Sequence, residues 1–432
     1  MIIIFDWITF LIGTYFSVIS FLRIRKGRYN IIDLCIAIYW IMQVLPIPIQ
    51  YICTLRAIET GIWRYMYLAM TDFWTGSIYD FITVVTIVIM HISSRRLVRS
   101  DKSANILKLK SVINYPLVKI FVLVGMFAPV ILSVALAPNP RIYFSYSYFY
   151  MNSYNELSAA YIYHANVVTR LCFITVIFTI IQYFSKSDKH LIFNIEVLAA
   201  VFLCTWINGK RAILIFMLFG ILAVDFLDST QDYKKLIKKA ILFAIISLVY
   251  FEAFSSITGK QSESEFFDLY NMYFSRLGCE KLSIYDHLYT NAMLEYPGQT
   301  LLYDLLFFVP RELWENKPSF FATYFTGYAY YGVGTHFLPS NLLVNIWTEF
   351  YANFGLIGHF IALLIVILLA KKAEISSSYL VYLSTAAFLV SYMSFGFEFI
   401  VLIIYAAMIA CFVFDKYRIH FQPGSLKLII KK

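Results

Sequence analysis

Residues 345–370 read NIWTEFYANFGLIGHFIALLIVILLA, an apolar run whose one acidic residue, Glu349, lies near its start. A helix of about 20 apolar residues crosses the roughly 30 Å hydrocarbon core of a bilayer, so this run predicts a membrane-spanning helix. Runs of the same character recur along the chain, at residues 2–22, 31–52, 66–91, 113–137, 159–184, 190–207, 211–228, 240–258, 376–394 and 396–415. The sequence therefore predicts an all-α polytopic integral membrane protein with about 11 transmembrane helices.

The composition of the 432-residue chain agrees with a membrane protein. It is 60% hydrophobic and 14% charged, whereas soluble domains are about 45–50% apolar and about 25% charged. The six cysteines are scattered without a C-x-x-C pair, which indicates neither a zinc site nor a disulfide framework. Because no internal repeat or linker divides the chain, we expect a single membrane domain over residues 1–432.

Lys and Arg residues predict the orientation of these helices. They cluster in every second loop, around residues 23–28, 95–110, 186–189, 234–239, 371–372 and 416–432. Cytoplasmic loops carry such an excess of positive charge, so the N-terminus is expected outside and the C-terminus in the cytoplasm. The net charge of +9 follows from this topology and does not argue for binding of nucleic acid.

One long segment of mixed polarity, residues 259–345, interrupts the apolar runs. Loops beyond about 15 residues are uncommon unless they are functional or disordered, and this one is too aromatic to be disordered. The expected topology makes it a large extracytoplasmic loop. Its helical stripe from Phe266 to Leu277 predicts a helix on the membrane surface or over the bundle, with Glu280 and Lys281 on the opposite, polar face.

The same loop contains a short apolar stretch, Leu301–Val309, whose one charged residue is Asp304. This stretch is too short to cross a membrane. We expect it to dip into the membrane interface and to end at Pro310, which would place Arg311 at the depth of lipid phosphates.

Basic residues on the expected outer side predict a polyanionic ligand. Arginine binds phosphate through two parallel hydrogen bonds, and a lipid-linked pyrophosphate at the outer leaflet has the matching chemistry. The candidate residues for binding this pyrophosphate are Arg311, Arg211, Arg170, Arg276 and Lys210.

The turn that contains Lys210 and Arg211, and the position of Arg170, have alternative interpretations. The turn Asn208-Gly209-Lys210-Arg211 presents two cations at the start of the next helix, which favours an anion there. The same cations could instead contact lipid headgroups. Arg170 lies deep in a predicted span, where a charge is costly, so it either faces the substrate or pairs with an acid such as Glu196 or Glu252.

Glycosyl transfer needs a base that deprotonates the attacking hydroxyl. Glu349 is the preferred candidate, because Asn345 lies one turn before it on the same helix face. His336 is the second candidate, and Asp286 and His287 are further ones in the loop. For each histidine, a structural role in the loop is the alternative.

Aromatic residues crowd the predicted outer loop at residues 138–158. They form either an interfacial aromatic belt or a platform for sugar rings, to which Tyr146 and Tyr148 would contribute together with Trp314 of the long loop. The chain has no P-loop, no G-x-G-x-x-G motif and no H-E-x-x-H motif. The sequence therefore indicates no nucleotide, no cofactor and no metal ion.

Three short stretches resemble motifs of the oligosaccharide repeat-unit polymerases, the O-antigen polymerases of the Wzy type. Residues 309–318, VPRELWENKP, are similar to the family's Pro-Arg…Trp…Lys-Pro element, and residues 347–358, WTEFYANFGLIG, to its Glu-x-Tyr-x-Asn-Phe-Gly-x-x-Gly element. Residues 208–211 are similar to its Gly-x-Arg turn. Many spans with one large outer loop late in the chain also match, whereas an Arg-x10-Gly repeat described in some members has no counterpart here.

The resemblance implies a membrane fold related to the C-type glycosyltransferases. It also implies metal-independent glycosyl transfer at the periplasmic face of a bacterial inner membrane, in the synthesis of polysaccharide such as that of lipopolysaccharide. The donor would be a growing glycan on undecaprenyl pyrophosphate, and the acceptor one repeat unit on a second undecaprenyl pyrophosphate. Further expected partners are membrane lipids, a chain-length regulator protein and a flippase.

Other functions fit parts of this pattern. An O-antigen ligase shares the architecture and differs in its acceptor, and a catalytic histidine such as His336 in the long loop would favour it. A flippase or other transporter of lipid-linked oligosaccharide would show paired halves and short loops, which this chain lacks. A membrane scaffold without chemistry is the remaining interpretation.

Overall fold

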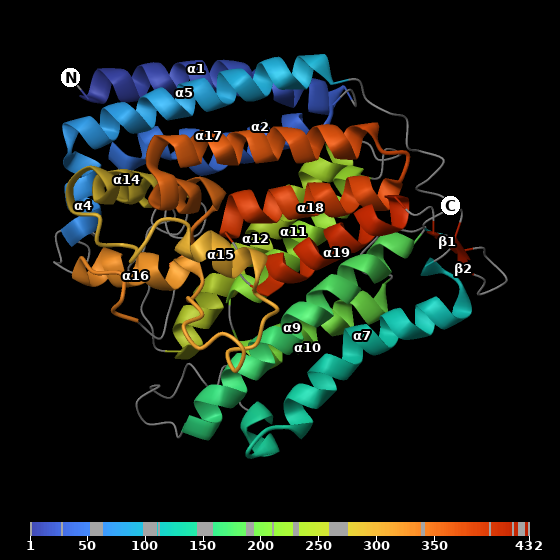
Figure 1. The fold of residues 1–432 in the computed structure, drawn as a ribbon. Helices are drawn as coiled ribbons and strands as arrows, with labels where there is room; N and C mark the ends of the chain where they lie inside the picture. The colour runs from blue at the N-terminus through green and yellow to red at the C-terminus, as the bar shows by residue number, and fades with distance from the viewer. Residues whose placement is uncertain are drawn as a thin grey trace. The chain divides into compact units, whose positions relative to one another are not determined.

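The computed structural model in Figure 1 is almost entirely helical over the part of the chain that it describes. The described residues are 2–26, 29–51, 64–97, 110, 113–144, 159–186, 194–209, 211–227, 233–258, 275–337, 342–396, 399–416, 419–421 and 428–430. Contacts divide the chain into a first compact unit, Met1–Ser100 with Ser264–His420 and Ile429–Lys432, and a second, Asp101–Glu263 with Phe421–Leu428. Whether these units form the single membrane domain expected from the sequence stays a prediction.

The two units have the following elements. The first contains α1 (Ile2–Arg25), α2 (Ile31–Tyr39), the π-helix η1 (Trp40–Val44), α4 (Arg64–Thr71), α5 (Phe73–Arg96), α14 (Leu277–Tyr285), the π-helix η5 (Asp286–Thr290), α15 (Gln299–Leu305), α16 (Phe321–Tyr331), α17 (Ile346–Ile375), α18 (Tyr379–Phe395) and α19 (Phe399–Lys416). The second contains α7 (Pro116–Ala135), the 3₁₀-helix η2 (Pro140–Phe144), α9 (Ala159–Ser185), α10 (Ile195–Asn208), α11 (Arg211–Leu227) and α12 (Tyr233–Thr258). The short strands β1 (Ile419–Phe421) and β2 (Leu428–Ile430) pair near the end of the chain.

Within the described residues, each predicted apolar run is mostly helical, which confirms the helical membrane fold in its coarse form. By length and composition, six described helices can cross a membrane, namely Ile3–Arg25, Ile31–Tyr51, Phe73–Arg96, Pro116–Ala135, Tyr163–Ser185 and Ile346–Ile375. Four shorter apolar helices are Ile195–Asn208, Ile213–Asp225, Tyr379–Phe395 and Val401–Val413. The count of about 11 spans and the likeness to the C-type glycosyltransferase fold stay predictions.

One predicted span is divided differently from the expectation. The run 66–91 begins in α4 and continues in α5, with Asp72 between the two helices. The side chain of Asp72 accepts a hydrogen bond of 2.8 Å from the backbone N–H of Thr75, and this N-cap starts α5 at Phe73. The apolar pattern alone did not reveal the break, because the residues on both sides of Asp72 are mostly apolar.

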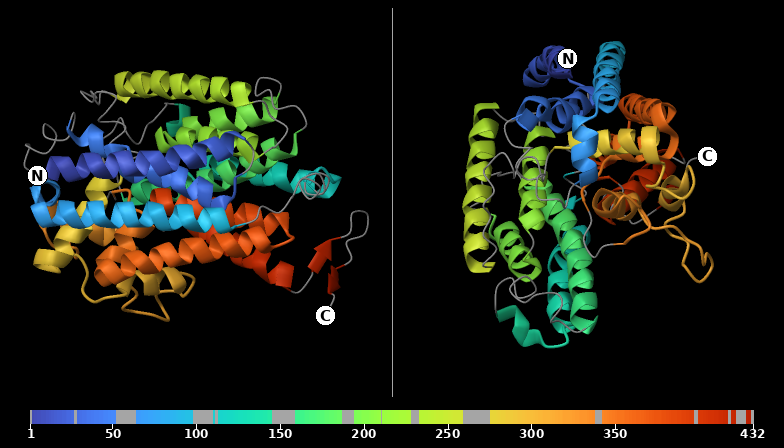
Figure 2. Two further views of the ribbon diagram at one scale, coloured as in Figure 1. Left: turned by 90° about the horizontal axis from the view of Figure 1, so that it is seen from above. Right: turned by 90° about the vertical axis from the view of Figure 1, so that its left-hand side faces the viewer.

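Basic helix ends gather at one end of the first unit. Arg23 near the end of α1 donates a hydrogen bond of 2.7 Å to Ser94 near the end of α5, and Glu374 near the end of α17 accepts one of 2.8 Å from the backbone N–H of Ile31, where α2 begins. Both views of Figure 2 accordingly keep α1 (dark blue) beside α5 (light blue). The basic residues on these helix ends are Arg23, Arg25, Arg95, Arg96, Lys371 and Lys372. This is the grouping that the expected topology requires, although the side of the membrane is not shown.

The opposite end of the first unit holds the described part of the long segment. There Gln50 donates a hydrogen bond of 2.9 Å to Asp6, which joins the end of the second span to the start of α1. Helix α14 packs against α4, α5 and α17, and α16 packs against α4. Figure 1 shows α4, α14 and α16 together at one end of the longer helices.

The expected polar face with Glu280 and Lys281 is wrong. Both side chains are buried in α14, at 0% and 1% exposure. Glu280 Oε1 lies 3.0 Å from His359 Nδ1 of α17. Lys281 lies 3.9 Å from Asp6 of α1, because a charge taken out of water needs an opposite charge beside it. The stripe expected from Phe266 to Leu277 lies, up to residue 274, outside the described residues.

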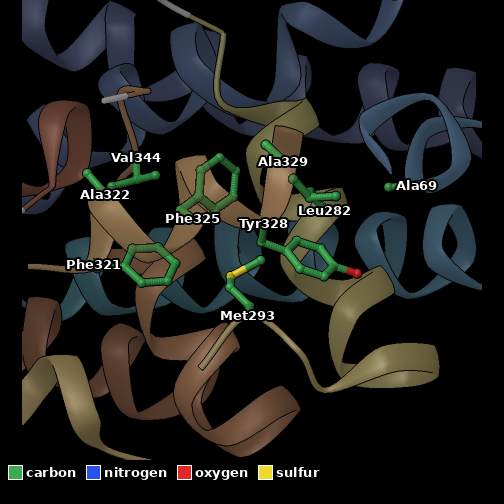
Figure 3. Close-up of a cluster of buried hydrophobic side chains, with 9 residues drawn as sticks. All are labelled: Ala69, Leu282, Met293, Phe321, Ala322, Phe325, Tyr328, Ala329 and Val344. Carbon is green, nitrogen blue, oxygen red and sulfur yellow. The ribbon is translucent and has the colours of Figure 1, made fainter. Parts of the chain in front are cut away.

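A compact apolar cluster holds α16 against the rest of this end. Phe321 and Phe325 of α16 lie 5.8 Å apart, ring centre to ring centre. Figure 3 shows the cluster, which collects side chains from several separate elements. Its members are Ala69, Leu282, Met293, Phe321, Ala322, Phe325, Tyr328, Ala329 and Val344. Residues 282, 293 and 321–329 of the long segment therefore pack into the first unit.

We expect the two ends of the first unit to face opposite sides of the membrane. In a cysteine-free variant, Asn316→Cys should react with a membrane-impermeant maleimide on intact cells, and Ser377→Cys should react only after permeabilisation, because positive charge is retained in the cytoplasm. Both residues are exposed, so access to the reagent depends on the side of the membrane. Labelling of both positions in intact cells, or the reverse pattern, would contradict the orientation.

Candidate functional site

Glu349 lies in the first turn of α17 and is fully buried. The helix starts there because the Asn345 side chain caps it, accepting a hydrogen bond of 3.0 Å from the backbone N–H of Thr348. The backbone N–H of Glu349 in turn donates to the carbonyl of Asn345 at 3.1 Å. Asn345 thus lies one turn before Glu349 as the N-cap of α17, with an extended backbone, and the expectation that the two side chains share a helix face stays a prediction.

A second buried carboxylate lies beside Glu349. The hydroxyl of Tyr392 in α18 is 3.2 Å from Glu349 Oε2 and 3.4 Å from Asp304 Oδ2 in α15. A phenol has a single hydrogen to donate, so it satisfies only one carboxylate at a time. Burial, and then the charge of Glu349, raise the pKa of Asp304 well above its usual range. Burial beside a second acid therefore favours the protonated form of Asp304.

Two further side chains tie α15 to α17 around this pair. The amide nitrogen of Asn353 donates hydrogen bonds of 2.8 Å to the backbone carbonyl of Glu349 and to the hydroxyl of Thr300. Among the described residues, Glu349 Oε1 and Asp304 Oδ1 have no hydrogen-bond partner. Each is a buried acceptor that a hydroxyl group could satisfy, which is the chemical property expected of a site for a polar substrate.

The glycines of the stretch 347–358 are needed by the shape of α17. Gly355 has a φ of 61° and a ψ of −143°, so two helical segments meet there. A Cβ at Gly355 would lie 2.4 Å from the His287 ring, and one at Gly358 would lie 1.9 Å from the carbonyl oxygen of Phe350. Only glycine fits at both positions, and the spacing of the motif therefore encodes a bend directly after the turn that holds Glu349 and Asn353.

The stretch 310–318 forms a tight exposed loop held by two cations. Arg311 donates to the backbone carbonyls of Lys317, at 2.9 Å, and of Pro318, at 3.5 Å. Lys317 donates to the carbonyls of Phe307, at 2.6 Å, and Val309, at 2.7 Å. Burial, and then the charge of Arg311, lower the pKa of Lys317. The Arg311 guanidinium has five N–H donors, so it can shape the loop and still bind an anion at its exposed edge.

Exposed apolar side chains surround this loop. Leu305 is 61% exposed, Phe308 67% and Leu313 80%, while Trp314 is half-buried. Large exposed apolar groups around a basic residue are typical of a surface that meets lipid. They agree with the expectation that residues 301–309 enter the membrane interface, which stays a prediction.

The other candidates of the first unit lie in different surroundings. His336 is exposed, with its ring 5.3 Å from the ring of Tyr331. Arg276 is buried and donates to the carbonyls of Ser394, at 3.0 Å, and Ser275, at 2.7 Å. Arg276 thus places a positive charge at the end of α18, where the helix dipole favours it.

The remaining candidates belong to the second unit. Arg170 is exposed on α9, and Glu196, one of the acids considered as its partner, bonds to Lys186. Gly209 ends α10 with a φ of 66°, which confirms the tight turn, and Arg211 begins α11. Lys210, Tyr146 and Tyr148 lie outside the described residues. The convergence of these groups with Arg311 on one pyrophosphate stays a prediction.

The sequence interpretation missed Asp304, Tyr392, Thr300 and Asn353 as parts of the Glu349 site. One signal was available, because Asp304 is the single charge in an apolar stretch too short to span the membrane. Such a residue is costly unless it is paired. No local pattern identified Glu349 as its neighbour, since the contact joins elements that are far apart in the sequence.

We expect Asp304 to make stability depend on pH. A carboxyl that binds its proton more tightly when folded stabilises the protein fully below its unfolded pKa of about 3.9, and this contribution is lost as pH rises toward the folded value. The thermal unfolding temperature of the purified protein should therefore fall with rising pH above about 4, and Asp304→Asn, which stays neutral, should flatten this dependence. Glu312→Gln, at an exposed position, is the matched control, and equal slopes for both variants and the wild type would contradict the raised pKa of Asp304.

Comparison of the chain with models of protein families, with curated proteins and with solved structures gives no match.

Proposed function

We propose that the protein polymerises lipid-linked oligosaccharide repeat units. In this proposal it transfers a glycan from undecaprenyl pyrophosphate to a second lipid-linked repeat unit at the outer face of the membrane. The observation that carries the proposal is the buried pair of Glu349 and Asp304, of which Glu349 belongs to the stretch that resembles the polymerase motif and Asp304 belongs to α15. The loop with Arg311 follows Asp304 directly in the chain, after α15.

The reaction needs one new bond and one broken bond. A hydroxyl of the acceptor sugar attacks the anomeric carbon of the donor glycan, and the bond from that carbon to the pyrophosphate oxygen breaks. The lipid pyrophosphate leaves with the bonding electrons, and the hydroxyl proton passes to a base. Catalysis then depends on positioning the two lipids and on stabilising the charge that develops on the leaving group.

Glu349 is the base in this proposal. Its Oε1 is an acceptor without a partner among the described residues, and the raised pKa of Asp304 favours a proton on Asp304 and not on Glu349. Because Glu349 is fully buried, an acceptor hydroxyl can reach it only after neighbouring groups move. Helix α15 is suited to this, since it is short and starts at Gly298, whose φ is 82°.

Arg311 is the main group for the pyrophosphate. It lies on an exposed loop among exposed apolar side chains, where a lipid-linked anion could approach from the membrane. Arg211, Arg170, Lys210 and Arg276 would add positive charge, and Trp314 would contact sugar. The basic helix ends lie at the other end of the first unit, which supports an outer position of this loop under the positive-inside rule.

A ligase is the second candidate. The observation that favours it is the exposed ring of His336 against Tyr331, within the segment where a catalytic histidine would be expected. A ligase would transfer the glycan to a different lipid acceptor with the same leaving group. The choice of acceptor in the assay separates the two enzymes.

We expect Arg311→Ala and Glu349→Gln to lose polymer in an assay with purified protein and lipid-linked repeat units. The wild type should give a ladder of products on a gel, and Glu349→Gln should be at least about 10²-fold slower, because a general base contributes about 10²–10⁴-fold. Arg211→Ala should also lose the ladder. Unfolding temperatures of all variants identify any that are only destabilised.

The controls decide between the interpretations. Glu312→Gln changes an exposed acid beside Arg311 and should keep the ladder. Full-length ladders from both Arg311→Ala and Glu349→Gln would refute the assigned site. Movement of the lipid across a bilayer without new glycosidic bonds would show a transporter, and transfer only to a lipid A core acceptor would show a ligase.

A further inference from the structure

A polar cavity lies at the basic end of the first unit, away from the Glu349 site. Its volume is about 290 Å³, near the lower bound of small-ligand pockets. It forms where the end of α1, the start of α2 and the end of α5 meet. The lining residues are Arg23, Tyr29, Asn30, Asp33, Ser94, Arg95 and Leu97.

The wall of this cavity is fixed by buried hydrogen bonds. Asp33 Oδ1 accepts from Arg23 Nη1 at 3.3 Å and from Ser94 Oγ at 2.8 Å. Asp33 Oδ2 accepts from the backbone N–H of Asn30 at 3.2 Å, and the Asn30 amide donates to the carbonyl of Ser94 at 2.9 Å. Asp33, Asn30 and Ser94 are at most 4% exposed, so these acceptors are occupied inside the structure.

The lining carries more positive than negative charge. Arg23 and Arg95 face a single acid, Asp33, and Arg23 already neutralises it at 3.3 Å. Among the described residues, Arg95 forms no hydrogen bond or ion pair. Arg23 uses Nη1 for both of its bonds, which leaves N–H donors of its planar fork for another acceptor. The cavity therefore offers donors and uncompensated positive charge, and its acceptors are used.

We propose that this cavity binds the phosphate group of an anionic ligand, and that the ligand is the headgroup of an anionic phospholipid. Guanidinium groups match the geometry of phosphate oxygens. The site lies at helix ends rich in Arg and Lys, where basic pockets between membrane helices bind anionic headgroups. A bound headgroup would bridge α1, α2 and α5 at the end opposite the Glu349 site. The site is independent of the proposed reaction.

The test measures thermal unfolding of the full-length protein in detergent while phosphatidylglycerol or phosphatidylcholine is added. Phosphatidylglycerol should raise the unfolding temperature, because a ligand that binds only the folded state stabilises it. Arg95→Gln should need about fivefold more phosphatidylglycerol for the same shift, since an arginine near the membrane surface contributes about 1 kcal/mol of attraction. For the same shift, Arg95→Lys should need an amount of phosphatidylglycerol between those needed by the wild type and by Arg95→Gln.

Arg96→Gln is the matched control, because Arg96 is an exposed neighbour on the same helix end that does not line the cavity. It should respond to phosphatidylglycerol as the wild type does. Glycerol 1-phosphate tests for a soluble source. A shift from phosphatidylglycerol alone supports the lipid headgroup, and an equal shift from glycerol 1-phosphate supports the phosphate site but overturns the lipid as its occupant. Identical responses of Arg95→Gln and Arg96→Gln, or equal stabilisation by phosphatidylcholine, would overturn the proposal.

Discussion

Charged side chains buried among apolar helices must be paired, and this constraint organises the first unit. A charge that leaves water loses its solvation and recovers it only through a partner. In this chain the partners lie far apart in sequence, and each pair fixes part of the segment 275–337 to a long helix. Lys281 lies beside Asp6 and Glu280 faces His359, while the two acids Asp304 and Glu349 both lie within hydrogen-bond distance of the Tyr392 hydroxyl. Residues 275–305, which read as an outer loop, are thereby anchored to the helices of this unit.

The Glu349 region combines this constraint with a backbone that only glycine permits. Asn345 caps the helix before Glu349, and Gly355 bends it afterwards. Asn353 lies between them, and its amide donates hydrogen bonds to the backbone carbonyl of Glu349 and to the hydroxyl of Thr300. Polar side chains and glycines spaced over a few residues thus build one capped and bent segment of α17, which gives a physical reason why these residue types occur together in this stretch.

The first unit has two ends of different chemistry. One end collects arginines, lysines and the polar cavity, and the other collects buried acids, exposed aromatic residues and the Arg311 loop. Positive charge at helix ends is expected on the cytoplasmic side of a membrane. Under the two proposals, the first of these ends would hold the contact with lipid and the second would hold the reaction site.

The sequence by itself determined the helices, because hydropathy and helix length are properties of each segment alone. It also predicted the turn at Gly209 and the helix turn that joins Asn345 to Glu349, since both depend on residues a few positions apart. Only the tertiary structure decided that Asp304 lies beside Glu349 and that Glu280 is buried against His359. Those contacts depend on which helix ends meet. Helix ends meet where buried polar and charged side chains find partners from distant parts of the chain, and no local sequence pattern shows this.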